Sequence, residues 1–200
     1  MRLFIAVNFC GETKKQILEI QDKLRAQTLQ GNFTRPENLH LTLVFIGETP
    51  KEKLDSLFRI MEEIQAPPFE ISFNCSGCFS NNKKELWWIG TDTKIHPVLE
   101  NIHRQLLDRL LGAGFQVDTR QFKAHITIGR EIKRSRPVVP GFREPSAGAE
   151  GSSSTMNSSP PGIKVKVDRI SLMKSEHVQG RLTYTEIFGR ELSGEMKPLP

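Results

Sequence analysis

Apolar residues alternate with polar ones along some stretches of the chain and recur three or four positions apart along others. The first pattern is typical of strands with one buried face, and the second is typical of amphipathic helices. We expect helices near residues 13–24, 50–66 and 93–111, and strands near residues 3–9, 38–46, 69–79, 84–90, 122–129, 163–174 and 181–190. This pattern predicts an α+β protein built from antiparallel sheets backed by helices.

The order of these elements is repeated once along the chain. A strand, a helix and a strand that carries His40-Leu-Thr-Leu43 are followed by a strand, a helix and a strand that carries His125-Ile-Thr-Ile128. The separation between the first strand and the histidine nearly agrees in the two copies. The repeat predicts two pseudo-symmetric lobes with a central cleft, and we expect residues 1–200 to form them as a single bilobal domain.

Residues 134–162 differ in composition from the rest of the chain. Ser, Gly and Pro dominate this segment, and large hydrophobic residues are few. Such a segment buries too little apolar surface to offset the entropy lost when it is ordered. We therefore expect a long flexible surface loop, inserted before the last two strands.

The repeated tetrapeptide brings its polar side chains together. Side chains on a strand point alternately to opposite faces, so Thr42 shares a face with His40 and Thr127 shares a face with His125. The hydrophobic neighbours are expected on the opposite, core-facing side: Leu39, Leu41, Leu43 and Phe45 in the first copy, and Phe122, Ala124, Ile126 and Ile128 in the second. A pseudo-two-fold axis would then place two imidazoles and two hydroxyls around one small volume.

These four side chains have the chemistry needed to open a cyclic phosphodiester. Histidine, with an unperturbed pKa of about 6.5, can take a proton from water or give one to a departing ribose oxygen at neutral pH. Threonine hydroxyls can donate hydrogen bonds to the non-bridging phosphate oxygens. A single His-x-Thr on a strand is usually structural, but two copies in matching positions favour a catalytic pair.

Basic residues are in excess over acidic ones. The formal charge is +5 and the pI is about 9.2, which favours anionic partners such as nucleic acid. Lys123, on the His125 face by strand parity, and Arg130, just past that strand, are candidate contacts to a substrate phosphate. The competing interpretation for each is a solvated surface residue.

Several other classes of protein are disfavoured. No run reaches the ~20 apolar residues of a membrane helix, and the apolar start of the chain is interpreted as a strand and not as a secretory signal. Three cysteines are too few for a disulfide framework, and the Cys75-x-x-Cys78 pair lacks the second pair that a zinc site needs. We expect a cytoplasmic protein with no membrane partner.

A metal site built on the two histidines is the main competing hypothesis. The sequence contains no H-x-H or H-x-x-x-H pair, and the nearest carboxylates, Glu37 and Glu131, flank the motif strands. The other histidines fall in the third helix and in a turn, where solvated or capping roles are usual: they are His96, His103 and His177. We expect neither a metal nor a cofactor.

Four segments together carry a family resemblance. They are Met1-Arg-Leu-Phe-Ile-Ala6, then Pro36-Glu-Asn-Leu-His-Leu-Thr-Leu43 followed by Phe45-Ile-Gly47, then Phe122-x-x-His125-x-Thr127-x-Gly129-Arg130, and finally Leu172-x-x-Ser175…Gly180…Tyr184. In this order they resemble the RNA 2′,3′-cyclic phosphodiesterases, also called 2′-5′ RNA ligase-like proteins, of the two-histidine phosphoesterase superfamily. The resemblance covers nearly the whole chain apart from residues 134–162.

The resemblance implies hydrolysis of RNA 2′,3′-cyclic phosphate ends to 2′-phosphomonoesters without a metal. It makes His40 the proton donor to the 3′-oxygen and His125 the proton acceptor from water, while Thr42 and Thr127 bind the phosphate. Ligation of 2′-5′ ends is expected to be a minor activity. The implied partner is RNA with a cyclic phosphate terminus, tRNA fragments included, and the expected oligomeric state is a monomer.

Two alternatives remain open from the sequence. A non-catalytic RNA-end binding module would hold the phosphate in the same cleft and release it unchanged. A phosphodiesterase for small cyclic nucleotides or ADP-ribose cyclic phosphate would use the same residues on a different substrate. Turnover compared between cyclic-phosphate-ended RNA and mononucleotides separates these hypotheses.

Overall fold

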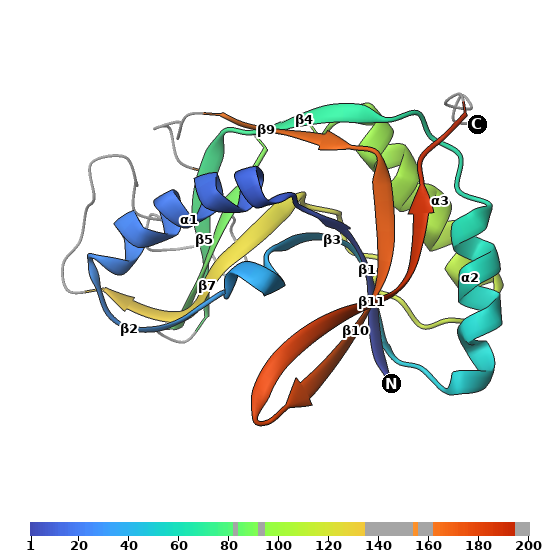
Figure 1. The fold of residues 1–200 in the computed structure, drawn as a ribbon, viewed down its shortest axis with the longest axis horizontal. Coiled ribbons are helices and arrows are strands. Elements are labelled where there is room, and N and C mark those ends of the chain that lie inside the picture. Colours follow the sequence, from blue (N-terminus) through green and yellow to red (C-terminus); the bar gives the residue numbers. More distant parts are fainter. Residues whose placement is uncertain (82–83, 92–94, 135–153, 156–161, 195–200) are drawn as a thin grey trace.

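A computed structural model of the chain describes residues 1–81, 84–91, 95–134, 154–155 and 162–194 (Figure 1). Most of the predicted loop at 134–162 therefore lies outside the described residues. None of the helices within the described ranges has both the length and the apolar character needed to cross a membrane.

The described ranges contain helices, short 3-10 turns and strands. The helices are α1 (Gly11–Arg25), α2 (Leu54–Glu62) and α3 (Pro97–Gly112), and the 3-10 turns are Pro36–Asn38 and Lys51–Lys53. The strands are β1 (Arg2–Asn8), β2 (Thr28–Phe33), β3 (His40–Glu48), β4 (Phe69–Phe73), β5 (Cys75–Asn81), β6 (Lys84–Gly90), β7 (His125–Arg134), β8 (Ser154–Thr155), β9 (Ile163–Val167), β10 (Arg169–Val178) and β11 (Arg181–Glu191).

Two antiparallel sheets form the two lobes (Figure 1). The first sheet has the strand order β11-β10-β1-β3, and the second has the order β2-β7-β6-β5-β8. A separate β4–β9 ribbon links them, because β4 leads into β5 of the second sheet and β9 leads into β10 of the first. The predicted α+β class with two pseudo-symmetric lobes is confirmed.

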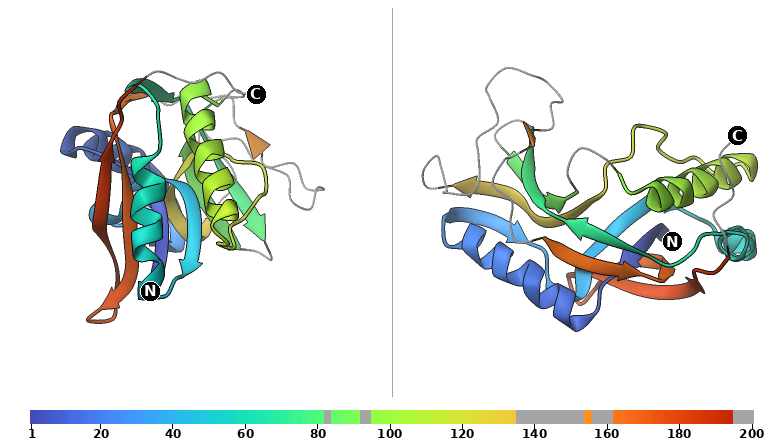
Figure 2. Two further views of the ribbon diagram at one scale, coloured as in Figure 1. Left: turned by 90° about the vertical axis from the view of Figure 1, so that its right-hand side faces the viewer. Right: turned by 90° about the horizontal axis from the view of Figure 1, so that it is seen from above.

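The helices are exchanged between the lobes. Helix α1 follows β1 of the first sheet but packs against β2 and β7 of the second, while α3 follows β6 of the second sheet but packs against β3 of the first (Figures 1 and 2). Helix α2 packs against α3 and β11. Most buried hydrophobic residues form one large cluster that includes Leu41 of β3 and Ile126 of β7. Each lobe therefore depends on a helix from the other half of the chain.

A side chain from each exchanged helix bonds to the backbone of the opposite motif strand. The buried Gln21 amide of α1 donates from Nε2 to the carbonyl oxygens of Ile128 (2.8 Å) and Thr34 (2.7 Å). In the other lobe, Nδ1 of His103 on α3 contacts the carbonyl oxygen of Leu43 at 2.9 Å. Leu43 and Ile128 are both the fourth residue of the repeated tetrapeptide, so the two contacts are pseudo-symmetric.

Two predicted strands are each divided in the structure, and one observed strand was not predicted. The run expected at 69–79 divides at Asn74, so β4 pairs with β9 and only β5 forms the hairpin with β6. The run at 163–174 divides in the same way at Asp168, into β9 and β10. Strand β2 was not predicted, because an exposed edge strand has few apolar residues to mark it.

Replacement of Gln21 by Met tests the helix exchange. Gln21→Met keeps the length of the side chain but leaves the Thr34 carbonyl oxygen without this donor, so we expect the free energy of unfolding to fall by about 1–3 kcal/mol. Urea denaturation followed by circular dichroism measures it. Gln16→Met, at an exposed position on the same helix, is the matched control and should change stability by less than ~0.5 kcal/mol. Equal stability of the two variants would contradict this role.

Candidate functional site

A pocket of about 360 Å³ lies between the two motif strands. Strands β1 and β3 contribute Arg2, Phe4, His40, Thr42 and Phe45, β10 and β11 contribute Ser175, Leu182 and Tyr184, and β7 contributes His125, Thr127 and Arg130. Five of the six candidate residues from the sequence therefore line one space. The sixth, Lys123, lies in an adjoining pocket.

A β-bulge follows the threonine in both motif strands. In β3, Thr42 pairs with Ala6 and Val44 pairs with Ile5, so Leu43 is an extra residue. In β7, Thr127 pairs with Trp88 and Gly129 pairs with Trp87, so Ile128 is an extra residue. A bulge of this kind shifts the alternation of side chains by one position. The same residues carry the carbonyls that Gln21 and His103 contact.

The bulges change which side chain reaches the pocket. Phe45 and Arg130, each five residues after the motif histidine, both line the pocket with it. The expectation that Phe45 faces the core is therefore wrong, and its side chain is 44% exposed. Arg130 lies within β7 and not past its end.

His40 is held by two hydrogen-bonding contacts and by aromatic packing. Its Nδ1 lies 2.7 Å from the carbonyl oxygen of Asn38, and its Nε2 lies 3.0 Å from the hydroxyl of Thr42. Since a carbonyl oxygen only accepts, Nδ1 carries the proton and Nε2 is the accepting nitrogen in the neutral ring. The imidazole also packs against Phe4 (centroids 4.8 Å apart) and edge-on against Tyr184 (5.1 Å).

His125 repeats this arrangement in the second lobe. Its Nδ1 lies 2.7 Å from the carbonyl oxygen of Lys123, again two residues earlier in the chain. Phe79 packs edge-on against the ring, with centroids 5.6 Å apart. In both lobes the backbone thus fixes the proton on Nδ1 and leaves Nε2 for chemistry.

Burial and nearby positive charge keep both imidazoles neutral. Burial is the largest cause that lowers the pKa of His40 to about 4, and the charges of Arg130 and His125 lower it further. Burial also lowers the pKa of His125, helped by Arg130 and Lys123. A bound phosphate anion would oppose the effect of these cations and would favour the protonated ring. Binding of an anion here would therefore raise the pKa of both histidines.

The backbone that holds His40 is tied to the β10–β11 hairpin. The side-chain amide of Asn38 donates to the carbonyl oxygen of Leu182 at 2.9 Å, and the Arg35 guanidinium donates to the same oxygen. Arg35 also forms an ion pair with Glu37 at 3.1 Å. Because Leu182 lines the pocket, the same contacts set the position of one pocket wall and of the His40 ring.

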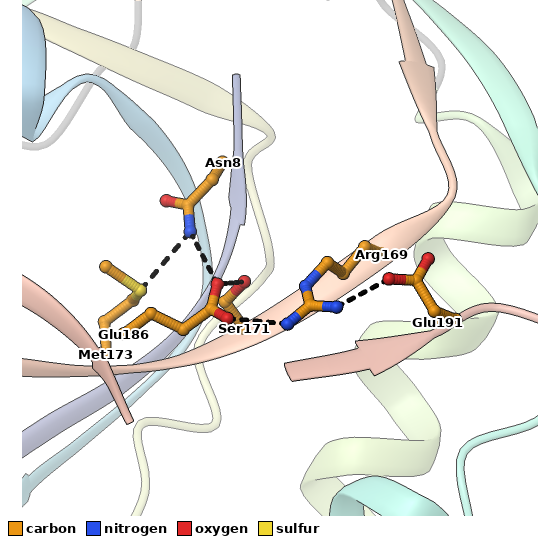
Figure 3. A network of polar contacts seen from close by, with 6 residues as sticks. All are labelled: Asn8, Arg169, Ser171, Met173, Glu186 and Glu191. Carbon is orange, nitrogen blue, oxygen red and sulfur yellow. Dashed lines mark hydrogen bonds and ion pairs between the residues drawn. The ribbon is translucent and has the colours of Figure 1, made fainter. Parts of the chain in front are cut away.

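A polar network lies on the first sheet beside the His40 strand (Figure 3). The Glu186 carboxylate accepts from the Ser171 hydroxyl (2.6 Å) and from Arg169 (2.7 Å), and Arg169 also bonds to Glu191 (2.6 Å). Burial would raise the pKa of Glu186, but the hydroxyl and the guanidinium hold it below its ordinary value. Asn8, which pairs with His40 across the β1–β3 ladder, donates weakly to Glu186 (3.5 Å). The network thus joins β1, β10 and β11 of the first sheet.

Sequence reasoning assigned no role to several pocket residues. Arg2, Phe4, Ser175 and Tyr184 appear in the segments that carry the family resemblance, but strand parity alone gives no reason to select them. They reach the pocket because β1 lies beside β3, and β10 and then β11 follow β1 in the same sheet.

The remaining histidines and the paired cysteines lie outside the pocket. His96 accepts the Val98 amide at the start of α3, His103 contacts Leu43, and His177 is exposed at the end of β10. Cys75 and Cys78 are buried on β5, where the Cys75 thiol donates to the Thr91 carbonyl oxygen (2.8 Å). Within the described residues no three His, Cys, Asp or Glu side chains are grouped to hold a metal ion.

Comparison with known proteins identifies relatives along most of the chain. The family model "LigT like Phosphoesterase" matches residues 8–88. An RNA 2′,3′-cyclic phosphodiesterase of Archaeoglobus fulgidus is 36% identical over 141 residues, which cover 70% of this chain and 77% of the relative. The enzyme of the same name from Methanocaldococcus jannaschii is 31% identical over 131 residues, or 65% and 71% of the two chains.

Solved structures share the fold. The crystal structure of Escherichia coli LigT complexed with 3′-AMP superposes with a TM-score of 0.76 at 23% identity, covering 96% of this chain and 98% of LigT. A Thermus thermophilus protein gives 0.74 at 24% identity, covering 98% of this chain and all of the other. At these identities the comparison supports the two-lobed fold alone.

The ionisation of His40 can be measured directly. Because its pKa is lowered from 6.5 to about 4, we expect its imidazole signals in an NMR titration to change only as the pH falls toward 4. The unfolded chain binds this proton first, so the stability that the neutral ring contributes is present above about pH 6.5 and is lost as the pH falls below it. A His40 midpoint at or above 6.5 would contradict the effect of burial, and added inorganic phosphate should raise the midpoint.

Proposed function

The chain belongs to the LigT-like phosphoesterase family of RNA 2′,3′-cyclic phosphodiesterases, and from this premise we propose that it opens RNA 2′,3′-cyclic phosphate ends to 2′-phosphomonoesters without a metal. The observation that carries the proposal is the pocket shared by His40 and His125. The two histidines come from different sheets, and each uses Nδ1 to contact a backbone carbonyl oxygen, which leaves Nε2 available for proton transfer. Opposed acid and base groups suit in-line displacement at phosphorus, where the nucleophile and the leaving group lie on opposite sides.

The proposed reaction moves one proton at each histidine. Neutral His125 takes a proton from water at Nε2 while the water oxygen forms a bond to phosphorus. The bond from phosphorus to the 3′-oxygen breaks, and protonated His40 gives its Nε2 proton to that oxygen. The products are a 3′-hydroxyl and a 2′-phosphomonoester, and proton exchange with solvent restores the two rings.

The other pocket side chains support this reaction by binding charge. Thr42 and Thr127 flank the histidines and can donate hydrogen bonds to the non-bridging oxygens, where charge builds up in the transition state. The Arg130 guanidinium contributes positive charge to the same pocket. Since this charge lowers the pKa of both rings in the free protein, the anionic substrate itself is needed to protonate His40.

The direction of proton transfer rests on the family. The backbone makes the same contact with both rings, so the assignment of His40 as donor and His125 as acceptor follows the resemblance.

The 5′-hydroxyl of a second RNA in place of water would give a 2′-5′ linkage, and we expect this ligation to be minor. The partner proposed is RNA with a cyclic phosphate end, tRNA fragments included, bound by a monomer.

Removal of either imidazole tests the catalytic pair. We expect His40→Ala and His125→Ala each to lower kcat on a nucleoside 2′,3′-cyclic phosphate by ~10²-fold or more, because each removes a proton-transfer group. Chromatography of the products measures turnover, and circular dichroism checks the fold. His177→Ala, at an exposed position, should retain activity. Undiminished turnover in either pocket variant would contradict the mechanism, and salt-sensitive binding of RNA ends without any product would support a binding module instead.

Chelation tests the absence of a metal requirement. We expect turnover to be unchanged in excess EDTA, because the proposed proton transfers use only side chains. The rate before and after dialysis against EDTA, with and without added zinc, is the measurement. A rate that vanishes on chelation and returns with zinc would favour a metal site at the histidines.

A further inference from the structure

A second pocket, of about 620 Å³, opens beside the first. The two pockets share Thr42, Phe45 and His125 as lining residues. The other lining residues are Leu43 and Val44 of β3, Phe79 of β5, His103 of α3, and Asp118 and residues 120–123 of the segment that connects α3 to β7. A ligand that enters the first pocket can therefore continue into the second along the same wall.

The sizes of the pockets indicate how a substrate divides between them. A volume of about 360 Å³ is near the lower end of the range for small-molecule sites, so one nucleoside cyclic phosphate fills the first pocket. In the terminal nucleotide the cyclic phosphate occupies both the 2′- and the 3′-oxygen. The RNA chain then continues only through the 5′-oxygen, and the preceding nucleotide must lie in an adjoining space.

Aromatic rings border this adjoining space. Phe45, Phe79 and Phe122 all line it, and aromatic side chains are the usual stacking platforms for bases of single-stranded RNA. Phe122 already stacks on His103 (centroids 4.3 Å apart), and Phe79 packs against His125. Phe45 is the most exposed large side chain at the junction of the two pockets, with the Arg2 guanidinium 5.1 Å from its ring centroid. Phe45 is therefore the ring available to a base.

Of Arg120 and Lys123, which both line the second pocket, Lys123 is the cation that remains available to bind a phosphate. Arg120 forms several hydrogen bonds with Asp118 and holds the pKa of that carboxyl at about 2, so their charges largely cancel. The exposed Lys123 lies with its Nζ 5.8 Å from the centroid of Phe79. In the part of the chain that the structure describes, no carboxylate forms an ion pair with Lys123.

We propose that the second pocket binds the nucleotide that precedes the cyclic end, with its base against Phe45 and the phosphodiester that joins it to the terminal nucleotide at Lys123. The inference rests on the proposed function and adds to it a preference for an RNA chain over a mononucleotide. His103 and Phe122 have structural roles in this account, because His103 contacts the Leu43 carbonyl oxygen at the β3 bulge.

A dinucleotide substrate tests the role of Lys123. We expect the protein to have a higher kcat/KM for a dinucleotide that ends in a 2′,3′-cyclic phosphate than for the nucleoside cyclic phosphate. Lys123→Gln should lower the ratio of the two kcat/KM values about fivefold, which corresponds to the free energy of an exposed ion pair. With a dinucleotide whose internal linkage is a neutral methylphosphonate, the variant should lower kcat/KM no more than it does with the nucleoside cyclic phosphate. Lys15→Gln, at an exposed position on α1 outside both pockets, is the matched control and should keep the wild-type preference.

The role of Phe45 has its own substrate control. Phe45→Leu keeps an apolar side chain but removes the ring, and we expect it to lower kcat/KM for the dinucleotide by about tenfold, as loss of base stacking does. When the 5′ nucleotide of the substrate lacks its base, the loss should be no larger than the loss with the nucleoside cyclic phosphate, because Phe45 also lines the first pocket.

The outcomes separate this inference from the proposed function. If the wild-type protein turns over both substrates equally well, or if Lys123→Gln lowers both rates to the same extent, the subsite is overturned while the hydrolysis stands. If neither substrate is turned over, the proposed function fails and the subsite fails with it.

Discussion

The site depends on one backbone feature, the β-bulge that follows the threonine in each motif strand. Up to Thr42 and Thr127 the two strands alternate regularly, and the extra residues Leu43 and Ile128 then shift the alternation. In each lobe a side chain from the exchanged helix contacts the carbonyl of that extra residue. The bulge is therefore stabilised by the opposite half of the chain, so the pocket forms only when both lobes have folded together.

The same interlocking explains the electrostatics of the pocket. Because the motif strands meet between packed lobes, both imidazoles are partly buried, and burial together with the cations beside them lowers the pKa of each ring. The hydrogen bonds from Nδ1 to the Asn38 and Lys123 carbonyl oxygens hold the rings without neutralising them. An anion in the pocket would supply the counter-charge, so in the proposed reaction the bound substrate itself favours protonation of His40.

The sequence predicts the local order well and the long-range contacts poorly. Period-two alternation correctly places Leu41 and Ile126 in the core opposite the histidines, because this depends only on a few neighbouring residues. It fails at Phe45, since the bulge before it depends on His103, sixty residues away. It also fails at Asn74 and Asp168, where an alternating run continues along the chain but its pairing partner changes. Residues such as Arg2 and Tyr184 reach the pocket through the order of strands, which no local pattern records.

Pseudo-symmetry alone cannot orient a substrate, so the differences between the lobes must do so. The bulges bring equivalent positions into the pocket, but one carries the Phe45 ring and the other carries the Arg130 guanidinium. An aromatic surface suits a base, whereas a cation suits the phosphate. Tyr184 and Phe4 enclose His40, while His125 borders both pockets. The residue five positions after each histidine thus breaks the symmetry of the two motif strands, and in the proposed reaction it would set the direction in which a nucleotide lies between the histidines.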